Sequence, residues 1–449
     1  MSTSFLIIIC FGSLFYLLWL LRRDRVSLGL PIAYLYSLLL IHVPGAFAHV
    51  AGGDFLHHSD LVNIAMRYTA LGAVFFVLGC WWARALTSHA ITTIRNVDRP
   101  RFWWYCVIGG WVLIFGLSPL YNIPSFNAVG DKGGSIWMLG VLLGLRGAFR
   151  QRDRKWIVIW ACTLLVYPMT VLVFAGFLSY GSAAVIVVCA ALTVSTRSYW
   201  RVVLGIVVFS YASLSIYVNY FEHRTEIRKE VWSKGSRGEK VETVLNSFVD
   251  FQSFDPSNSQ HLIDLDKRLN ENYFVGLAAR RIELGQVTYL KGESLWEGLI
   301  ALVPRVLWPE KPVYGGSPHI VSKMTGLRFN SQTSIGVGNV MELQINFGMP
   351  GVAIGFFVLG WAIGKLDLKA AIAERRGEQG SAIMYFLPCV AMIQPNGSIV
   401  EVTSGAAAAF VAAYLWSRLW IHQVEQRRTF SEPTPSQRTA IAPSMPSSM

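Results

Sequence analysis

The feature that most constrains this chain is a series of apolar runs, each about twenty residues long, that recurs along its length. Each run is long enough to cross the ~30 Å hydrocarbon core of a membrane as a helix. A soluble domain does not need so many uninterrupted runs. The sequence therefore predicts an all-α, polytopic helical integral membrane protein with about 11 transmembrane helices, near residues 4–21, 29–50, 66–83, 102–121, 134–149, 156–175, 177–195, 202–220, 347–365, 381–400 and 403–422.

The net charge of +12 is concentrated on alternate segments between these runs and on the C-terminal tail. An excess of Lys and Arg on alternate loops is typical of the cytoplasmic side of a membrane protein. The pattern therefore predicts an N-terminus outside and a C-terminus inside, and it does not indicate a nucleic-acid partner. All six cysteines lie in apolar runs, so we expect no disulfide framework and no metal site.

One hydrophilic segment interrupts this rhythm. We expect N-terminal transmembrane helices (about eight) over 1–221, a large outer loop with amphipathic helices over 222–346, about three C-terminal transmembrane helices over 347–422, and a disordered tail over 423–449. Within the loop, apolar residues at helical spacing predict helices over 238–254, 260–284 and 293–303. The Gly-, Ser- and Thr-rich strip 314–338 is predicted to cover the spans, and a long structured loop between packed spans is usually functional.

The loop suggests a pocket between its helices and the spans. The candidate cations are residues of this loop. Arg280 and Arg281 continue an apolar helix face, and the alternative is a solvated helix end with Arg280 paired to Glu283. Arg305 lies between two prolines beside Trp308, whose ring suits headgroup depth, and the alternative is an arginine extended towards lipid phosphates. Lys311 is a further substrate-binding candidate, with a structural ion pair as its alternative.

Three residues are candidates to receive a proton. Glu342 lies just before a span, where an acid is costly unless it is paired or useful. His319 has a suitable unperturbed pKa but is also an ordinary loop residue. Glu401 lies between two late spans and equally fits a packing role. The glycine-rich stretch 335–339 follows no strand and lacks the lysine of a nucleotide-binding loop, so we interpret it as a turn.

The run Val303 to Pro312 (VPRVLWPEKP) and the run Val340 to Gly351 (VMELQINFGMPG) resemble the signature of the O-antigen polymerase-like family, the bacterial oligosaccharide repeat-unit polymerases. The resemblance implies a metal-independent membrane glycosyltransferase without a cofactor, in the bacterial inner membrane with a periplasmic N-terminus. It implies that Arg305 holds the leaving group, that Arg280 or Arg281 is a second cation, and that Glu342 is the acid or base.

The same resemblance implies the partners. An undecaprenyl-diphosphate-linked oligosaccharide would be the donor, a second lipid-linked repeat unit the acceptor, and membrane lipids, a chain-length regulator and a flippase would be further partners. Two alternatives stay open: a ligase that transfers finished glycan from the lipid carrier, and a lipid-linked sugar flippase or transporter. A flippase should carry charges inside its spans and repeated halves, and the sequence shows few such charges and no repeat.

Overall fold

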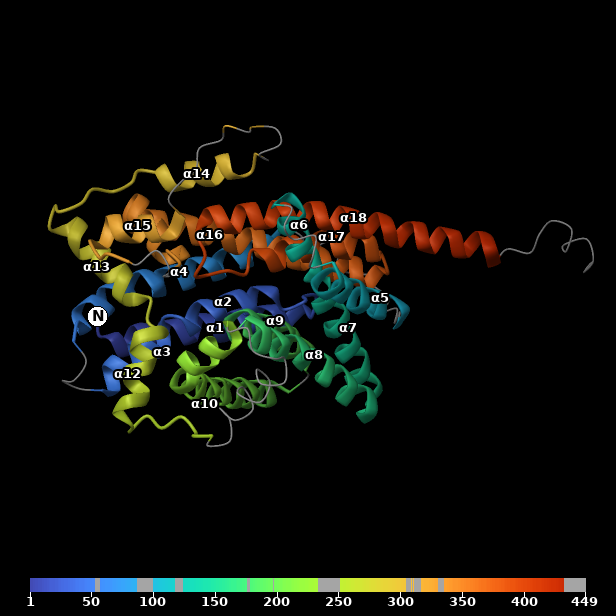
Figure 1. Cartoon of the computed structure of the whole chain (residues 1–449), viewed down its shortest axis with the longest axis horizontal. Helices are drawn as coiled ribbons and strands as arrows, with labels where there is room; N and C mark the ends of the chain where they lie inside the picture. Colours follow the sequence, from blue (N-terminus) through green and yellow to red (C-terminus); the bar gives the residue numbers. More distant parts are fainter. Residues whose placement is uncertain are drawn as a thin grey trace, which may run out of the picture.

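The chain is helical throughout its described part. A computed structural model describes residues 1–52, 57–86, 100–117, 124–175, 178–196, 198–232, 251–303, 308, 310, 316–329 and 335–431. Within these ranges there are helices and no strand, so the all-α prediction is confirmed (Figure 1).

Among the described residues, seven helical segments are long and apolar enough to cross a membrane. They are α1 (Thr3–Asp24), α2 with α3 (Leu30–Leu40 and Val43–Ala51), α4 (Ser59–Ala85), α8 (Arg154–Ala175), α10 (Tyr199–Trp232), α16 (Asn339–Arg376) and α18 (Ile399–Ser431). The other helices of the bundle are α5 (Pro100–Trp111), η3 (Val112–Gly116), α6 (Pro124–Gly134), α7 (Ile136–Gln151), α9 (Leu178–Ser195) and α17 (Gln379–Ala391). The chain therefore has the apolar helices of a membrane protein, and the larger number of eleven spans stays a prediction.

Several helices extend beyond the apolar runs that predicted them. Helix α4 begins at Ser59 and α16 begins at Asn339, each about two turns before the predicted span, because polar residues in the first two turns of both helices interrupt the apolar pattern. Helix α10 continues to Trp232, into the predicted loop, and α18 continues to Ser431, past the predicted start of the tail at residue 423.

Four short helices lie outside the long bundle, at the end where α16 begins (Figure 1). They are α12 (Ser259–Arg268), α13 (Asn272–Glu283), α14 (Glu293–Ala301) and α15 (Gly316–Thr325). The helix expected from Glu293 is present and starts after Gly292, whose φ of 96° suits glycine. The helix expected over 260–284 is instead two helices, and most of the one expected over 238–254 lies outside the described residues.

Helices α4 and α16 pack against each other most closely in the centre of the bundle (Figure 1). A Cβ on Gly79 of α4 would clash with the carbonyl oxygen of Phe357, and a Cβ on Gly360 of α16 would clash with that of Phe76. Small residues at such crossings allow two backbones to approach closely. This contact fixes α16, which carries the residues of the site, against the core.

Helix α16 is interrupted near its outer end. Gly348 has φ 64° and ψ −145°, which are not helical values, and Pro350 follows it. Residues 339–347 therefore form a short outer section of α16, and Leu290 N donates a hydrogen bond to the Ile345 carbonyl at 2.9 Å. This outer section is held by the segment that leads into α14.

The opposite end of the bundle is rich in arginine, and it encloses the turn between α1 and α2. Asp367 of α16 accepts hydrogen bonds at Oδ1 from the backbone N–H of Leu28 at 2.9 Å and of Leu30 at 3.2 Å. Arg84 of α4 donates to the Val26 carbonyl at 2.9 Å. Both charged side chains lie in segments expected to be loops, yet they are buried. Their hydrogen bonds with the backbone groups of this turn compensate for the loss of water.

Candidate functional site

Three polar side chains line one face of the outer section of α16. Asn339, Glu342 and Asn346 are spaced by three and four residues, which places them on one side of a helix. All three are buried, with exposed fractions of 2%, 0% and 1%. Buried polar groups are usually hydrogen-bonded, so we expect each of these side chains to have specific partners on neighbouring segments.

Glu342 contacts the start of α18. Its Oε2 accepts a hydrogen bond from the backbone N–H of Ile399, the first residue of α18, at 2.7 Å. The first N–H groups of a helix have no partner within the helix and favour a negative charge. Glu342 Oε1 is also buried, and it has no hydrogen-bond partner among the described residues. One oxygen is thus fixed by the fold, and the buried Ser294 hydroxyl lies beside the same carboxyl group.

Asn346 ties the loop helices to this face. Its Nδ2 donates to Ser294 Oγ at 2.7 Å and to the Glu342 carbonyl oxygen at 2.7 Å, and its Oδ1 accepts from the backbone N–H of Gly292 at 2.9 Å. Ser294 lies in the first turn of α14. The start of α14 is therefore held next to Glu342.

Asn339 joins three segments at the other end of the face. Tyr34 of α2 donates its hydroxyl proton to Asn339 Oδ1 at 2.7 Å. Asn339 Nδ2 donates to the Gly397 carbonyl at 2.9 Å, and its backbone N–H donates to the Pro395 carbonyl at 2.8 Å. The turn between α17 and α18 is thereby fixed onto the beginning of α16.

A second carboxyl group lies beside this junction. Glu271 is half-buried at the start of α13, and a Cβ on Gly338 would lie 2.5 Å from its Oε2. Burial raises the pKa of the Glu271 carboxyl to about 8. Glu271 is therefore largely protonated at neutral pH, and its carboxyl O–H can donate a hydrogen bond.

The glycines before Asn339 are required by close packing. A Cβ on Gly336 would clash with the carbonyl oxygen of Asn396, and Gly338 has a φ of 70°. Residues 335–338 have no regular secondary structure and lie against the turn that contains Asn396. The close approach at Gly336 and the positive φ at Gly338 account for the glycines of this stretch without a phosphate ligand.

The two arginines predicted on α13 have structural partners. Arg280 is exposed and lies 3.6 Å from Glu283, which is the ion pair given as the alternative in the sequence analysis. Arg281 is half-buried, and its guanidinium donates to the Met324 carbonyl at 3.1 Å and to Gln286 Oε1 at 3.2 Å. Arg281 therefore stabilises the carbonyl end of α15.

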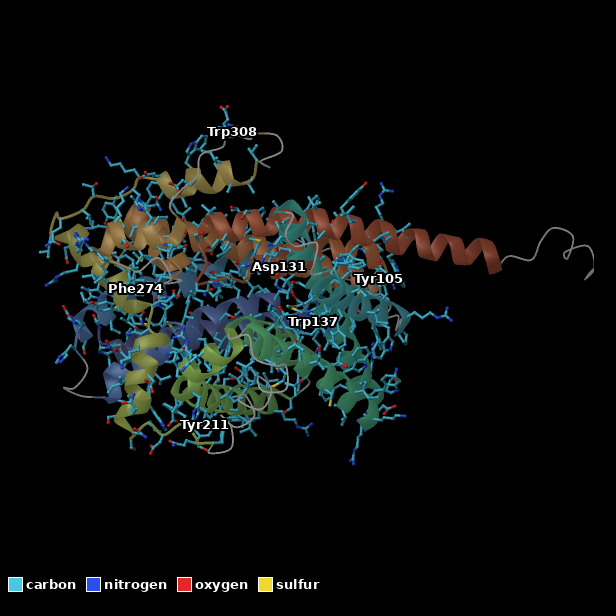
Figure 2. The ribbon with its side chains drawn as sticks, viewed as in Figure 1. Tyr105, Asp131, Trp137, Tyr211, Phe274 and Trp308 are labelled. Carbon is cyan, nitrogen blue, oxygen red and sulfur yellow. The ribbon has the colours of Figure 1, made fainter. Side chains whose placement is uncertain are left out.

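The predicted motif around Trp308 is only partly described. Trp308 is 39% exposed and lies beyond the end of α14, away from the bundle (Figure 2). Arg305 and Lys311 lie outside the described residues. An exposed ring at this place remains compatible with the interfacial position expected for it.

The other two proton-acceptor candidates lie on other helices, His319 on α15 and Glu401 on α18. His319 is exposed on α15, and it lies near Glu297, whose carboxyl pKa is raised by burial and by the charge of Glu293. Glu401 accepts from the Ser398 backbone N–H at 3.2 Å while its own N–H donates to Ser398 Oγ at 3.1 Å, which is a capping box at the start of α18. Glu401 is thus a helix-capping residue.

Sequence reasoning missed Tyr34, Glu271 and Asn339. The one signal available was the polar run Asn270-Glu271-Asn272 inside an apolar pattern, since such a run needs partners if it is buried. No cluster of His, Cys, Asp and Glu among the described residues has the composition of a metal site.

The neighbours of Glu271 belong to a chain of hydrogen bonds. It runs from His42 Nδ1 to Asn272 (2.9 Å), then through Asn270 to Asp266 (2.8 and 2.6 Å), and on to His49 Nε2 (2.7 Å). These contacts fasten α12 and α13 to α3, so both histidines, which lie within an apolar run, are used in packing.

The helices and the buried carboxyl face define an all-helical protein with a polar site at one end of an apolar bundle. A family model described as "domain of unknown function (DUF8712)" matches residues 53–386, which is most of the chain, and the chain belongs to that family. No curated protein and no solved structure matches it.

Proposed function

We propose that the chain is a membrane glycosyltransferase that polymerises lipid-linked oligosaccharide repeat units at the face where α12 to α15 lie. The observation that carries the proposal is Glu342, a fully buried carboxyl group with one oxygen fixed by Ile399 and the other without a hydrogen-bond partner among the described residues. A buried acid at the end of an apolar bundle is costly unless it is useful. Helices α14 and α15 cover the same end, as a substrate pocket requires (Figure 1).

We further propose that the bundle crosses the membrane eleven times. Helix α5 with η3, α7, α9 and α17 would supply the four crossings beyond the seven long apolar segments. Consecutive helices then alternate in direction, and the arginine-rich ends of α1, α4, α7 and α16 share one side. By the positive-inside rule that side is cytoplasmic, which gives the proposed bacterial inner membrane location with a periplasmic N-terminus.

The reaction would break the bond between the donor sugar and its diphosphate and form a bond from that sugar to an acceptor hydroxyl. The electron pair of the broken bond leaves with the lipid diphosphate, whose negative charge the cations of the sequence motif, Arg305 and Lys311, would balance. The acceptor proton goes to Glu342 Oε1. The protonated Glu271 would hold a sugar hydroxyl by a hydrogen bond.

The first test is the glycan profile of a strain that lacks the gene, complemented with wild type, Glu342→Gln or Glu283→Gln. Glutamine keeps an oxygen for the Ile399 N–H but cannot take up a proton at neutral pH. We expect wild type and the exposed control Glu283→Gln to restore long chains, and Glu342→Gln to leave single repeat units despite normal amounts in the membrane. Long chains with Glu342→Gln would remove Glu342 from the chemistry.

The same profile separates the alternatives. Long chains that stay on the carrier lipid in the deletion strain indicate a ligase. Single repeat units that stay on the cytoplasmic side of the membrane indicate a flippase. Unchanged glycans in the deletion strain exclude the proposed function altogether.

A further inference from the structure

A cavity of about 960 Å³ lies at the arginine-rich end of the bundle, away from Glu342. Residues of α1, α2, α5, α7, α9 and α10 form its wall, together with the last turn of α16 and residues just after α1, α7 and α9. This volume is in the upper part of the ~300–1,000 Å³ range of ligand pockets. The cavity is therefore large enough to hold part of a lipid.

The cavity is strongly basic. One acidic side chain, Glu374, and six arginines line it: Arg25, Arg146, Arg150, Arg152, Arg201 and Arg375. Within the described part of the chain, Arg25, Arg152 and Arg201 form no ion pair with a carboxylate. The positive charge here is thus not neutralised by the fold itself, and an anion would be attracted to it.

Arg146 fixes the position of this charge. Its guanidinium donates to the Ser27 carbonyl at 2.8 Å and to the Ala191 carbonyl at 3.2 Å, so it is held between the turn after α1 and the end of α9. Its Nε is buried and has no hydrogen-bond partner among the described residues. A guanidinium held in this way is oriented before any ligand arrives, which suits recognition of a phosphate.

Most of the rest of the wall is apolar, apart from the hydroxyl residues Thr193, Ser195 and Thr196 at the end of α9. Leu14, Ile32 and Phe209 line the cavity from α1, α2 and α10, all of which are long apolar segments. A free phosphate would use only the basic part of such a cavity. An amphiphile would use both parts, with its head group at the arginines and its chains along the apolar residues.

We propose that this cavity binds a membrane lipid through its anionic phosphate head group. The site is separate from the proposed glycosyltransferase site, since the two lie at opposite ends of α16. Arginine on this side of the bundle is expected from topology alone, so the test must compare arginines that line the cavity with arginines that do not.

The experiment measures lipid binding by the full-length protein, purified in an uncharged detergent, with native mass spectrometry. The probes are phosphatidylglycerol, phosphatidylcholine and inorganic phosphate. The variants are Arg152→Gln/Arg201→Gln, which removes two arginines of the cavity, and the control Arg23→Gln/Arg376→Gln, which removes two exposed arginines at the same end outside the cavity.

We expect wild type and the control to retain phosphatidylglycerol in preference to phosphatidylcholine, and the cavity variant to bind phosphatidylglycerol about tenfold more weakly. Equal loss in both double variants would mean that only net charge matters, and would overturn the proposal. Competition by inorganic phosphate as effective as that by the lipid would also overturn it. If the cavity variant does not fold, the proposal is tested on wild type alone. A wild-type protein that does not prefer phosphatidylglycerol to phosphatidylcholine contradicts the proposal.

Discussion

The Arg84 guanidinium lies 3.6 Å from Asp367 Oδ2 inside the bundle, with the two side chains 5% and 0% exposed. The pair links α4 to α16 close to the crossing of these helices at Gly79 and Gly360. Because Asp367 also accepts from the backbone of Leu28 and Leu30, one carboxylate joins α4 and α16 to the turn between α1 and α2 and to the first residue of α2.

We therefore expect Asp367→Ala to lower stability strongly. The substitution leaves the buried Arg84 with the partly exposed Asp24 at 3.7 Å and removes the acceptor of the Leu28 and Leu30 N–H groups. Breaking a buried pair in this way costs about 3–5 kcal/mol. The midpoint of thermal unfolding in detergent should fall well below that of wild type. Arg280→Ala, which breaks only the exposed pair with Glu283, should leave the midpoint nearly unchanged, and a similar shift in both variants would contradict this view.

The second prediction concerns the pH dependence of stability. The pKa of Glu271 is raised by burial to about 8 in the folded protein, above its ordinary value of 4.5. The folded state then binds more protons than the unfolded state between these values, so this group makes stability fall as pH rises from about 4.5 to 8, by up to ~1.4 kcal/mol per unit. Glu271→Gln should reduce that fall, and Glu283→Gln should keep it. Unfolding measured at pH 5, 7 and 9 would show whether the slope depends on Glu271.

The third prediction separates the two roles of Glu342. Glu342→Gln retains an acceptor for the Ile399 N–H, so its unfolding midpoint should stay close to that of wild type. Glu342→Ala leaves this N–H without its partner in a buried place, at a cost of about 1–3 kcal/mol. If both substitutions lowered the midpoint equally, the hydrogen bond to Ile399 would not be the stabilising contact.

The fourth prediction tests the helix crossing. Gly360→Ala adds a Cβ where the Phe76 carbonyl leaves no space, and overpacking of this kind costs about 1–3 kcal/mol. Gly12→Ala in α1 is the matched control, since nothing lies within 4 Å of its added Cβ. Protein yield and unfolding midpoint should fall for Gly360→Ala alone.

The sequence predicted features that depend on local pattern. Apolar runs predicted the long helices, and apolar residues at helical spacing predicted a helix that begins at Glu293, where α14 begins. The break between α12 and α13 was not predicted, because Asn272 at the start of α13 forms its hydrogen bonds with His42, which precedes α3 and is 230 residues away. The start of α4 at Ser59 was also missed, since the polar residues Asp60, Asn63 and Arg67 precede the apolar run.

The site shows the same limit. Glu342 was a candidate from its position at the start of a span, but its partner Ile399 is 57 residues further along the chain. Arg281 is a substrate-binding candidate from the sequence, and its hydrogen bond to the Met324 carbonyl on α15 joins residues that are 43 positions apart. Contacts of this kind depend on packing and not on spacing.

The hydrogen bond from Ile399 to Glu342 also bears on how this family is delimited. The family match ends at residue 386, before the turn and helix that supply this N–H, the Gly397 carbonyl and the Pro395 carbonyl. A fragment cut at the boundaries of the match would keep Asn339 and Glu342 but lose the surfaces that bury them. The unit that carries out any chemistry at Glu342 is therefore longer than the unit that sequence similarity defines.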